Sequence, residues 1–278
     1  MAHRPLLYCT HRPGPPLDRF VEQLWYWEGI PPAHAQDRLM PRGTSGLMIN
    51  LAEDETRLYT GAGDDVVQRM RGAVLVGAYA RYFVIDTREQ RANVGVAFRP
   101  GGTWPFFDPA GDELQNEHVS LRDLWGSAGE TLRERIVAAP TPRDKLLLLE
   151  AELLARAIRP LQRRAEVDFA LSRLADPPPD YSIAMLSEHV GLSARRFTRL
   201  FTLEVGLTPK LYSRVRRFQR VMQAMDGQAN DWTEVAQRCG YFDQSHLIHE
   251  FKRLSGSTPT AYRPLSADQP SHVPLPNR

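Results

Sequence analysis

The chain has 278 residues with 42% hydrophobic and 24% charged side chains, a balance that excludes a disordered or fibrous protein. Its length favours two domains, its net charge of +2 says little about partners, and its two cysteines are too few for a disulfide framework or a four-cysteine zinc site. No apolar run reaches the roughly 18 residues of a membrane-spanning helix and no signal peptide opens the sequence, so we expect a cytoplasmic protein without membrane contact.

The first part of the chain contains short runs of strand-forming residues separated by Gly, Pro and Asp. Six strands are predicted, around Val21 to Trp27, Gly46 to Leu51, Arg57 to Thr60, Ala73 to Ala78, Tyr82 to Asp86 and Val94 to Phe98. Strands this short and this closely spaced predict a small barrel or sandwich.

From Leu121 onward the apolar spacing becomes helical. The clearest helix is predicted over Asp144 to Arg159, where leucines fill one broad face, and Pro160 is expected to end it. A second helix is predicted over Gln162 to Ala175, before a Pro-rich break.

An internal repeat follows this break. The segment Leu186 to Gly191 recurs as Val235 to Gly240, forty-nine residues later, and after one inserted residue the offset becomes fifty. At that offset Phe201 matches Phe251, and the matching continues through the Gly, Thr, Pro and Tyr residues that follow. We interpret the repeat as two copies of a helix-turn-helix unit, at about 182–205 and 231–255.

Each copy has the signals of two short helices around a tight turn. Ser182 and Ser193 are good N-caps in the first copy, and Asp231 and Asp243 take these places in the second. A glycine ends the first helix of each copy. The exposed positions predicted for the second helices are Arg195, Thr198, Arg199 and Thr202 in the first copy and Gln244, Ser245, His246, Ile248 and His249 in the second.

Between the copies, Thr208 and Pro209 predict the start of a connecting helix that reaches about Met225. Its polar faces carry four arginines, at positions 214, 216, 217 and 220. From Tyr181 to Arg263 there are twelve Lys and Arg against seven Asp and Glu, so this segment holds the cationic excess of the chain. Such an excess is what a phosphate-binding surface requires.

These patterns predict an α+β protein, with a β-rich, barrel-like N-terminal domain that has flanking helices and an all-α C-terminal domain with two helix-turn-helix units. The expected domains are residues 1–160 and 161–263. Residues 264–278 are rich in Pro and Ser, and we expect a disordered tail there.

The C-terminal hundred residues resemble the DNA-binding domain of the AraC-type transcription regulators. The resemblance rests on GYFDQSHLIHEFKRLSGSTPTAYR, from Gly240 to Arg263, and on RRFTRLFTLEVGLTPKLY in the first copy. The N-terminal part is similar to an uncharacterised domain that accompanies this DNA-binding domain in some family members, through Leu39 to Leu51 and Val94 to Gly102. The resemblance implies a sequence-specific regulator that binds double-stranded DNA, with a sensor or dimerisation domain in residues 1–160.

On this interpretation the second helix of each unit contacts bases in a major groove, and the connecting helix contacts phosphates. The predicted DNA-binding residues are Arg195, Thr198, Arg199, Arg217, Gln244, Ser245, His246 and His249. His246 and His249 could instead bind a metal ion, but no Cys or carboxylate stands at ligand spacing to complete the site. We expect no metal, no cofactor and no catalytic residue.

Three hypotheses remain for the N-terminal domain. It senses a small-molecule effector, or it only mediates formation of a homodimer, or it is an enzyme of the DNA-repair kind fused to a DNA-binding domain. The enzymatic alternative needs a reactive group, and Cys9 is the one cysteine in that half. RNA polymerase is a further candidate partner.

Overall fold

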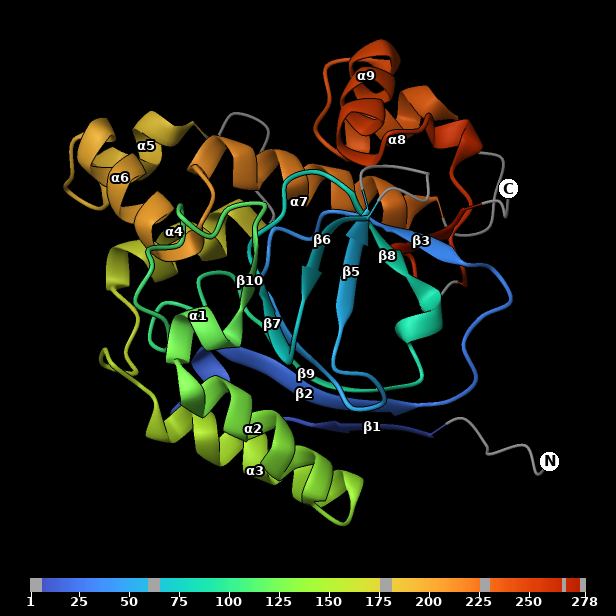
Figure 1. The fold of residues 1–278 in the computed structure, drawn as a ribbon. Coiled ribbons are helices and arrows are strands. Elements are labelled where there is room, and N and C mark those ends of the chain that lie inside the picture. Colours follow the sequence, from blue (N-terminus) through green and yellow to red (C-terminus); the bar gives the residue numbers. More distant parts are fainter. Residues whose placement is uncertain (1–6, 60–65, 176–181, 226–230, 267–268, 276–278) are drawn as a thin grey trace.

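The computed structural model describes residues 7–59, 66–175, 182–225, 231–266 and 269–275. The strands of these residues form two antiparallel sheets with helices on either side (Figure 1). The first sheet has the order β1-β2-β9-β4-β7-β10, with bounds Leu7–His11, Val21–Glu28, Ala92–Phe98, Gly46–Asn50, Ala73–Val76 and His118–Ser120. The second has the order β11-β3-β8-β5-β6, with bounds His272–Pro274, Gln36–Leu39, Phe83–Asp86, Thr56–Tyr59 and Val66–Met70.

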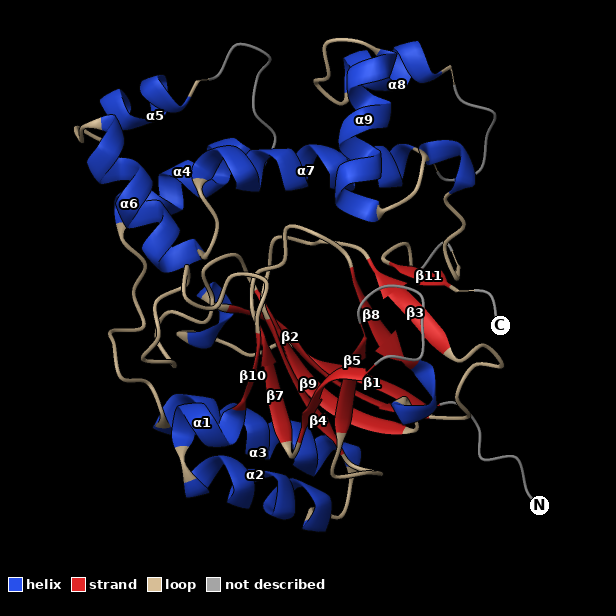
Figure 2. Cartoon of the chain, turned by 45° about the horizontal axis from the view of Figure 1, so that its top comes forward, coloured by secondary structure: helices blue, strands red, loops and turns tan. Residues whose placement is uncertain are grey.

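Three helices belong with the sheets: α1 (Leu121–Trp125), α2 (Ser127–Ala138) and α3 (Pro142–Ala155). Helices α2 and α3 lie against the first sheet, on the side away from the rest of the molecule (Figure 2). We call these strands and helices the sheet domain. Its core is continuous from β2 and β9 to α3, where Leu24, Phe98 and Leu149 are all fully buried. Phe106 and Phe107 are both buried in this core as well.

The remaining helices form a second layer on the other side of the sheets (Figure 2). They are α4 (Ala165–Ala175), α5 (Ile183–His189), α6 (Ala194–Val205), α7 (Pro209–Ala224), α8 (Trp232–Arg238) and α9 (Gln244–Ser255), and we call them the helical domain. The α+β fold class predicted from the sequence is confirmed, and all six predicted strands are present. The predicted boundary at residues 160 and 161 falls between α3 and α4.

Two arginines tie the segment between α3 and α4 to the sheet domain. The Arg159 guanidinium donates to the carbonyl oxygens of Trp104 (2.8 Å) and Asp108 (2.9 Å) and lies 4.0 Å from the centre of the Trp104 ring. Arg163 donates to the carbonyl oxygens of Pro100 (2.6 Å) and Arg19 (2.8 Å). These bonds satisfy loop carbonyls that would otherwise lack partners, so the connection between the domains is held against the sheet domain.

The two domains also share cores. Ala78 and Ala80, after β7, are buried in the same cluster as Phe201 of α6. Met40, which follows β3, is buried among Phe251 and other residues of the second helix-turn-helix unit. The helical domain is therefore packed on the sheet domain through both of its units.

The expectation of a disordered tail over 264–278 is wrong for the residues that the structure describes. Residues 272–274 form β11, which pairs antiparallel with β3, so that Val273 lies opposite Arg38. The ladder is extended by bonds from Met40 N to Ser271 O (2.8 Å) and from Leu275 N to Gln36 O (2.9 Å). Proline-rich composition was a poor guide here, because an edge strand needs donors on one side only and tolerates proline.

We expect the last strand to contribute measurably to stability. Val273 and Leu275 are buried against residues of both domains, and burying a side chain of this size contributes about 1.5–3 kcal/mol. A chain that ends at Leu265 should therefore lose about 3 kcal/mol or more of unfolding free energy, measured by urea denaturation. A chain that ends at Leu275 is the matched control, and equal stability of the two would show that β11 contributes nothing.

Candidate nucleic-acid interface

The two helix-turn-helix units have the predicted caps. The Ser182 and Ser193 side chains accept hydrogen bonds from the backbone N–H groups three residues later, and Asp243 does the same at α9. Asp231 caps α8 by accepting from Thr233 N (2.8 Å). Each cap satisfies a backbone donor that has no partner inside its helix, so the short helices α5 and α8 have defined starts.

The units are structural repeats as well as sequence repeats. Phe201 and Phe251 are both fully buried, and α6 and α9 both end at a left-handed glycine, Gly206 (φ 87°) and Gly256 (φ 73°). The copies diverge afterwards. The first continues into the 16-residue helix α7, whereas the second makes one 3-10 turn, Pro259–Ala261, before the chain runs to β11.

Truncating either buried phenylalanine should destabilise the protein. Phe201→Ala and Phe251→Ala each leave a cavity in one core, and such changes cost about 3–5 kcal/mol. Denaturant midpoints measure the loss. Phe242→Ala is the control, because the Phe242 side chain is 89% exposed; equal midpoints for all three variants would contradict the buried positions of Phe201 and Phe251.

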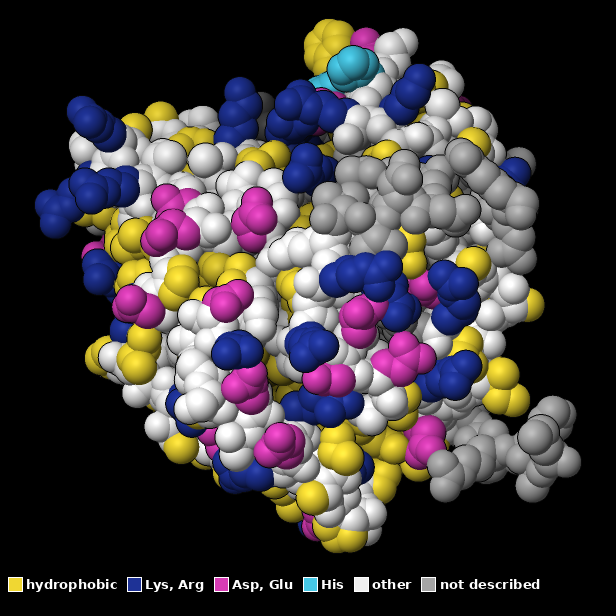
Figure 3. All heavy atoms as spheres, in the orientation of Figure 1, with side chains coloured by type: hydrophobic (Ala, Val, Ile, Leu, Met, Phe, Trp, Pro, Cys, Tyr) yellow, Lys and Arg dark blue, Asp and Glu magenta, His cyan; other side chains and the backbone are white. Residues whose placement is uncertain are grey.

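The exposed face of α6 carries the predicted basic residues. Arg195 and Arg199 are exposed and Thr198 is half-buried, and neither arginine forms an ion pair with any residue that the structure describes. Arg196, which the sequence interpretation left out, is equally exposed; its signal was the adjacent arginine pair in the first turn. Lys and Arg side chains gather over α5, α6 and α7 at the edge of the molecule (Figure 3).

The exposed side chains in the first half of α9 are polar and include no Lys, Arg, Asp or Glu, whereas Lys252 and Arg253 are exposed in its last turn. Gln244, Ser245 and His249 are exposed, and His246 is half-buried with its ring edge against Tyr241, 5.3 Å between centroids. The structure brings all four predicted residues to this face. Ile248, which was expected to be exposed, packs partly buried against the second core.

The arginines of α7 hold the second unit. Arg214 bonds Glu250 of α9 through Nε to Oε2 (2.6 Å) and Nη2 to Oε1 (3.0 Å). Arg217 Nη1 donates to Gly240 O (3.2 Å), and its guanidinium lies 5.2 Å from the centre of the Tyr241 ring. The sequence suggested phosphate contacts for this row of arginines. In the structure Arg214 and Arg217 join α7 to α9 and to the turn before it.

Breaking the Arg214–Glu250 pair should destabilise the second unit. The side chains are 17% and 10% exposed, so Arg214→Ala leaves a largely buried carboxylate without its partner. We expect a loss of about 2–3 kcal/mol, less than the 3–5 kcal/mol of fully buried pairs. Arg196→Ala, at an exposed arginine of α6, should change the unfolding free energy by less than about 0.5 kcal/mol. A similar result for both variants would show that the pair does not hold the unit.

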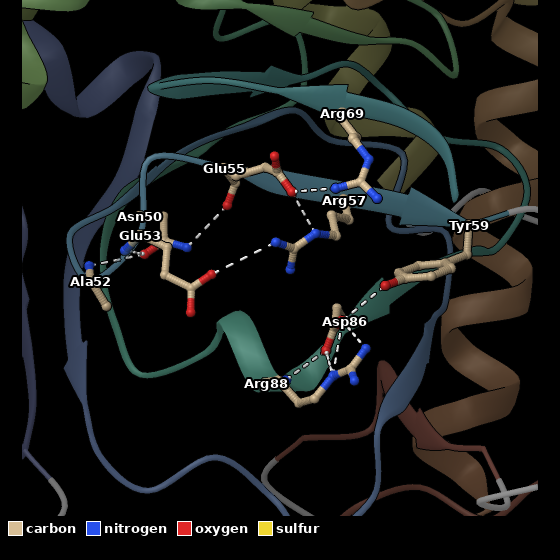
Figure 4. A network of polar contacts seen from close by, with 9 residues as sticks. All are labelled: Asn50, Ala52, Glu53, Glu55, Arg57, Tyr59, Arg69, Asp86 and Arg88. Atoms are coloured by element: carbon tan, nitrogen blue, oxygen red, sulfur yellow. Dashed lines mark hydrogen bonds and ion pairs between the residues drawn. The ribbon is translucent and has the colours of Figure 1, made fainter. Parts of the chain in front are cut away.

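The sheet domain has a charged cluster of its own, on β5 and β8 (Figure 4). Tyr59 donates to Asp86 (2.8 Å), and Arg88 donates to the same carboxylate through Nη2 (2.6 Å). Burial raises the pKa of Asp86, but the bonds from Arg88 and Tyr59 outweigh it and lower the pKa. Arg57 pairs with Glu55 (2.5 Å) nearby. Each of these carboxylates is paired with an arginine, so the cluster serves to join the strands.

Comparisons with known proteins agree with this geometry. Residues 186–264 match a family described as "Helix-turn-helix domain", and residues 9–120 match a "Domain of unknown function" (DUF6597). The Arabinose operon regulatory protein of Escherichia coli K12 is 24% identical over 80% of this chain and 82% of its own length. The chain is an AraC-type transcription regulator. Most of the residues that match the helix-turn-helix family lie in its helical domain.

Two other comparisons cover different shares of this regulator. The probable transcriptional regulator LumQ of Photobacterium leiognathi is 34% identical over 30% of the chain, and the match spans a third of LumQ. The crystal structure of ToxT from Vibrio cholerae O395 covers 92% of the chain and 96% of its own, with 9% identity and a TM-score of 0.43. No described helix is long and apolar enough to cross a membrane.

Proposed function

We propose that α6 and α9 are recognition helices that enter two successive major grooves of one DNA duplex. Arg195, Thr198 and Arg199 contact bases in one groove. In the next groove the contacts come from Gln244, Ser245, His246 and His249. The observation that supports this assignment is that both helices are held at their buried faces by a single helix, α7, while the polar faces stay exposed.

The length of α7 suits this arrangement. Its 16 residues span about 24 Å at 1.5 Å per residue, and the bodies of the two units extend the separation toward the roughly 34 Å of one DNA turn. Binding energy then comes mainly from phosphate neutralisation. Arg217 belongs to this part of the proposal, because the residue is half-exposed and its bond to Gly240 O uses Nη1 and not Nη2.

Base and phosphate contacts predict different mutant behaviour. Arginine donates to both O6 and N7 of guanine, so Arg199→Ala should cost about 1–3 kcal/mol of binding and relax preference at one or two positions. Arg217→Ala should weaken specific and unrelated DNA alike, and lower the salt slope of log affinity by about 1. Titrations at several salt concentrations measure both. Loss of base preference in Arg217→Ala, with an unchanged salt slope, would reverse its assigned role.

The spacing of half-sites tests the proposed function directly. A duplex selected by the full chain from a random pool supplies the binding site, and five base pairs are then inserted between its half-motifs. The insertion turns the second half-motif to the opposite face of the duplex, so footprinting should lose protection there. The controls are a duplex with ten inserted base pairs and the duplex with no insertion. Undiminished affinity after the five-pair insertion would show that one unit alone engages DNA.

For the sheet domain we favour a sensor or self-association role, with a small-molecule effector, a second copy and RNA polymerase as proposed partners. The shared cores support it, because a change in the sheet domain reaches both recognition helices through Met40 and Ala80. A thermal-shift screen of metabolites separates sensing from dimerisation alone, since a true effector stabilises the native chain. The enzymatic alternative is not favoured: the named relatives are regulators, and Cys9 packs partly buried against the core of the sheet domain.

A further inference from the structure

The turn between α8 and α9 exposes a phenylalanine. Phe242 is 89% exposed, more than any other large apolar side chain in the described part of the chain. It stands between the buried Tyr241 and Asp243, which caps α9. Figure 3 shows hydrophobic side-chain atoms beside a histidine at the outer tip of the second unit.

Phe242 is the residue by which the second turn is longer than the first. In the first unit Leu192 N donates to Ser187 O (2.9 Å), and in the second Tyr241 N donates to Ala236 O (2.8 Å). These equivalent bonds close the two turns, so Tyr241 takes the place of Leu192. The next residue in the first unit is the N-cap of α6, whereas in the second Phe242 is inserted before the N-cap of α9.

The inserted ring is almost entirely exposed to solvent in the free protein. An apolar residue just before an N-cap often packs on the fourth residue of the helix, which in α9 is Leu247. Leu247 is fully buried in the second core and Phe242 is not part of that core. A ring of this size loses about 1.5–3 kcal/mol of hydrophobic stabilisation when it is left in water, so a bound partner is the place where that stabilisation is regained.

The position of the ring indicates what the partner is. The N-terminal residues of a recognition helix face base edges in the major groove, and Phe242 directly precedes this end of α9, next to Gln244 and Ser245. The apolar group that the major groove offers is the C5-methyl of thymine. We propose that Phe242 packs on a thymine methyl group in the second half-site, as an apolar specificity contact that the first unit lacks.

The proposal rests on the proposed entry of α9 into a major groove, and single methyl deletions test it. Each thymine of the second half-site in the selected duplex is replaced in turn by deoxyuridine, which removes only the methyl group. The full chain should lose about fourfold in affinity at one position, the value of one buried carbon. Phe242→Ala should lose at least as much on the original duplex and become insensitive to deoxyuridine at that position. Phe242→Leu should keep part of the discrimination.

Two controls separate the possible failures. Ile30→Ala alters another exposed apolar residue, 62% exposed and in the sheet domain, and should leave DNA affinity unchanged. If His249→Ala weakens binding but Phe242→Ala does not, the thymine contact is wrong while the second unit still binds DNA. If both variants bind like the unaltered chain, the proposed function itself fails. If Phe242→Ala binds DNA normally but lowers transcription in vitro, the ring contacts a protein such as RNA polymerase, and the inference is overturned.

Discussion

The arrangement of the helical domain depends on one apolar stripe along α7 that is divided between two cores. Tyr212 and Val215, near its start, are buried with α6 in the first unit. Phe218 and Met222, two turns later, are buried with α9 in the second. Because a single helix supplies both cores, the angle between the units is set by helix geometry and not by a flexible linker. The Arg214–Glu250 pair fixes the same relation from the polar side of α7.

The sheet domain packs closely against both helix-turn-helix units. Gly111 has no room for a side chain, because a carbon added there would lie 2.6 Å from the backbone nitrogen of Gly206, at the end of α6. On the other unit, Arg38 of β3 donates to Ser255 O (3.3 Å), at the end of α9. Helices α6 and α9 are thus both contacted at their C-terminal ends by the sheet domain. Because these contacts are at the C-terminal ends, the sheet domain holds α6 and α9 without covering their exposed faces.

Local signals carried most of what the sequence could predict. The repeat, its caps and its buried phenylalanines depend on spacing within one unit, so the helix-turn-helix pair was predictable to within a few residues. The roles of Arg214 and Arg217 were not, because the partners Glu250 and Gly240 lie more than twenty residues away and nothing in an arginine row distinguishes a bond to protein from a bond to phosphate. The inserted Phe242 was visible as an offset change, but its exposure required the fold. The strand β11 was missed because its partner β3 lies more than two hundred residues earlier.

The place of β11 gives the chain an uncommon connectivity. The backbone leaves the sheet domain after α3, builds the helical domain, and returns to complete the second sheet. In topological terms the helical domain is an insertion within the sheet domain, attached at two chain crossings. A body attached twice cannot swivel about one hinge, so any rotation of α6 and α9 against the sheets must bend both crossings or detach the last strand. An excised N-terminal half would also leave β3 as an open edge, a surface that invites pairing with another chain.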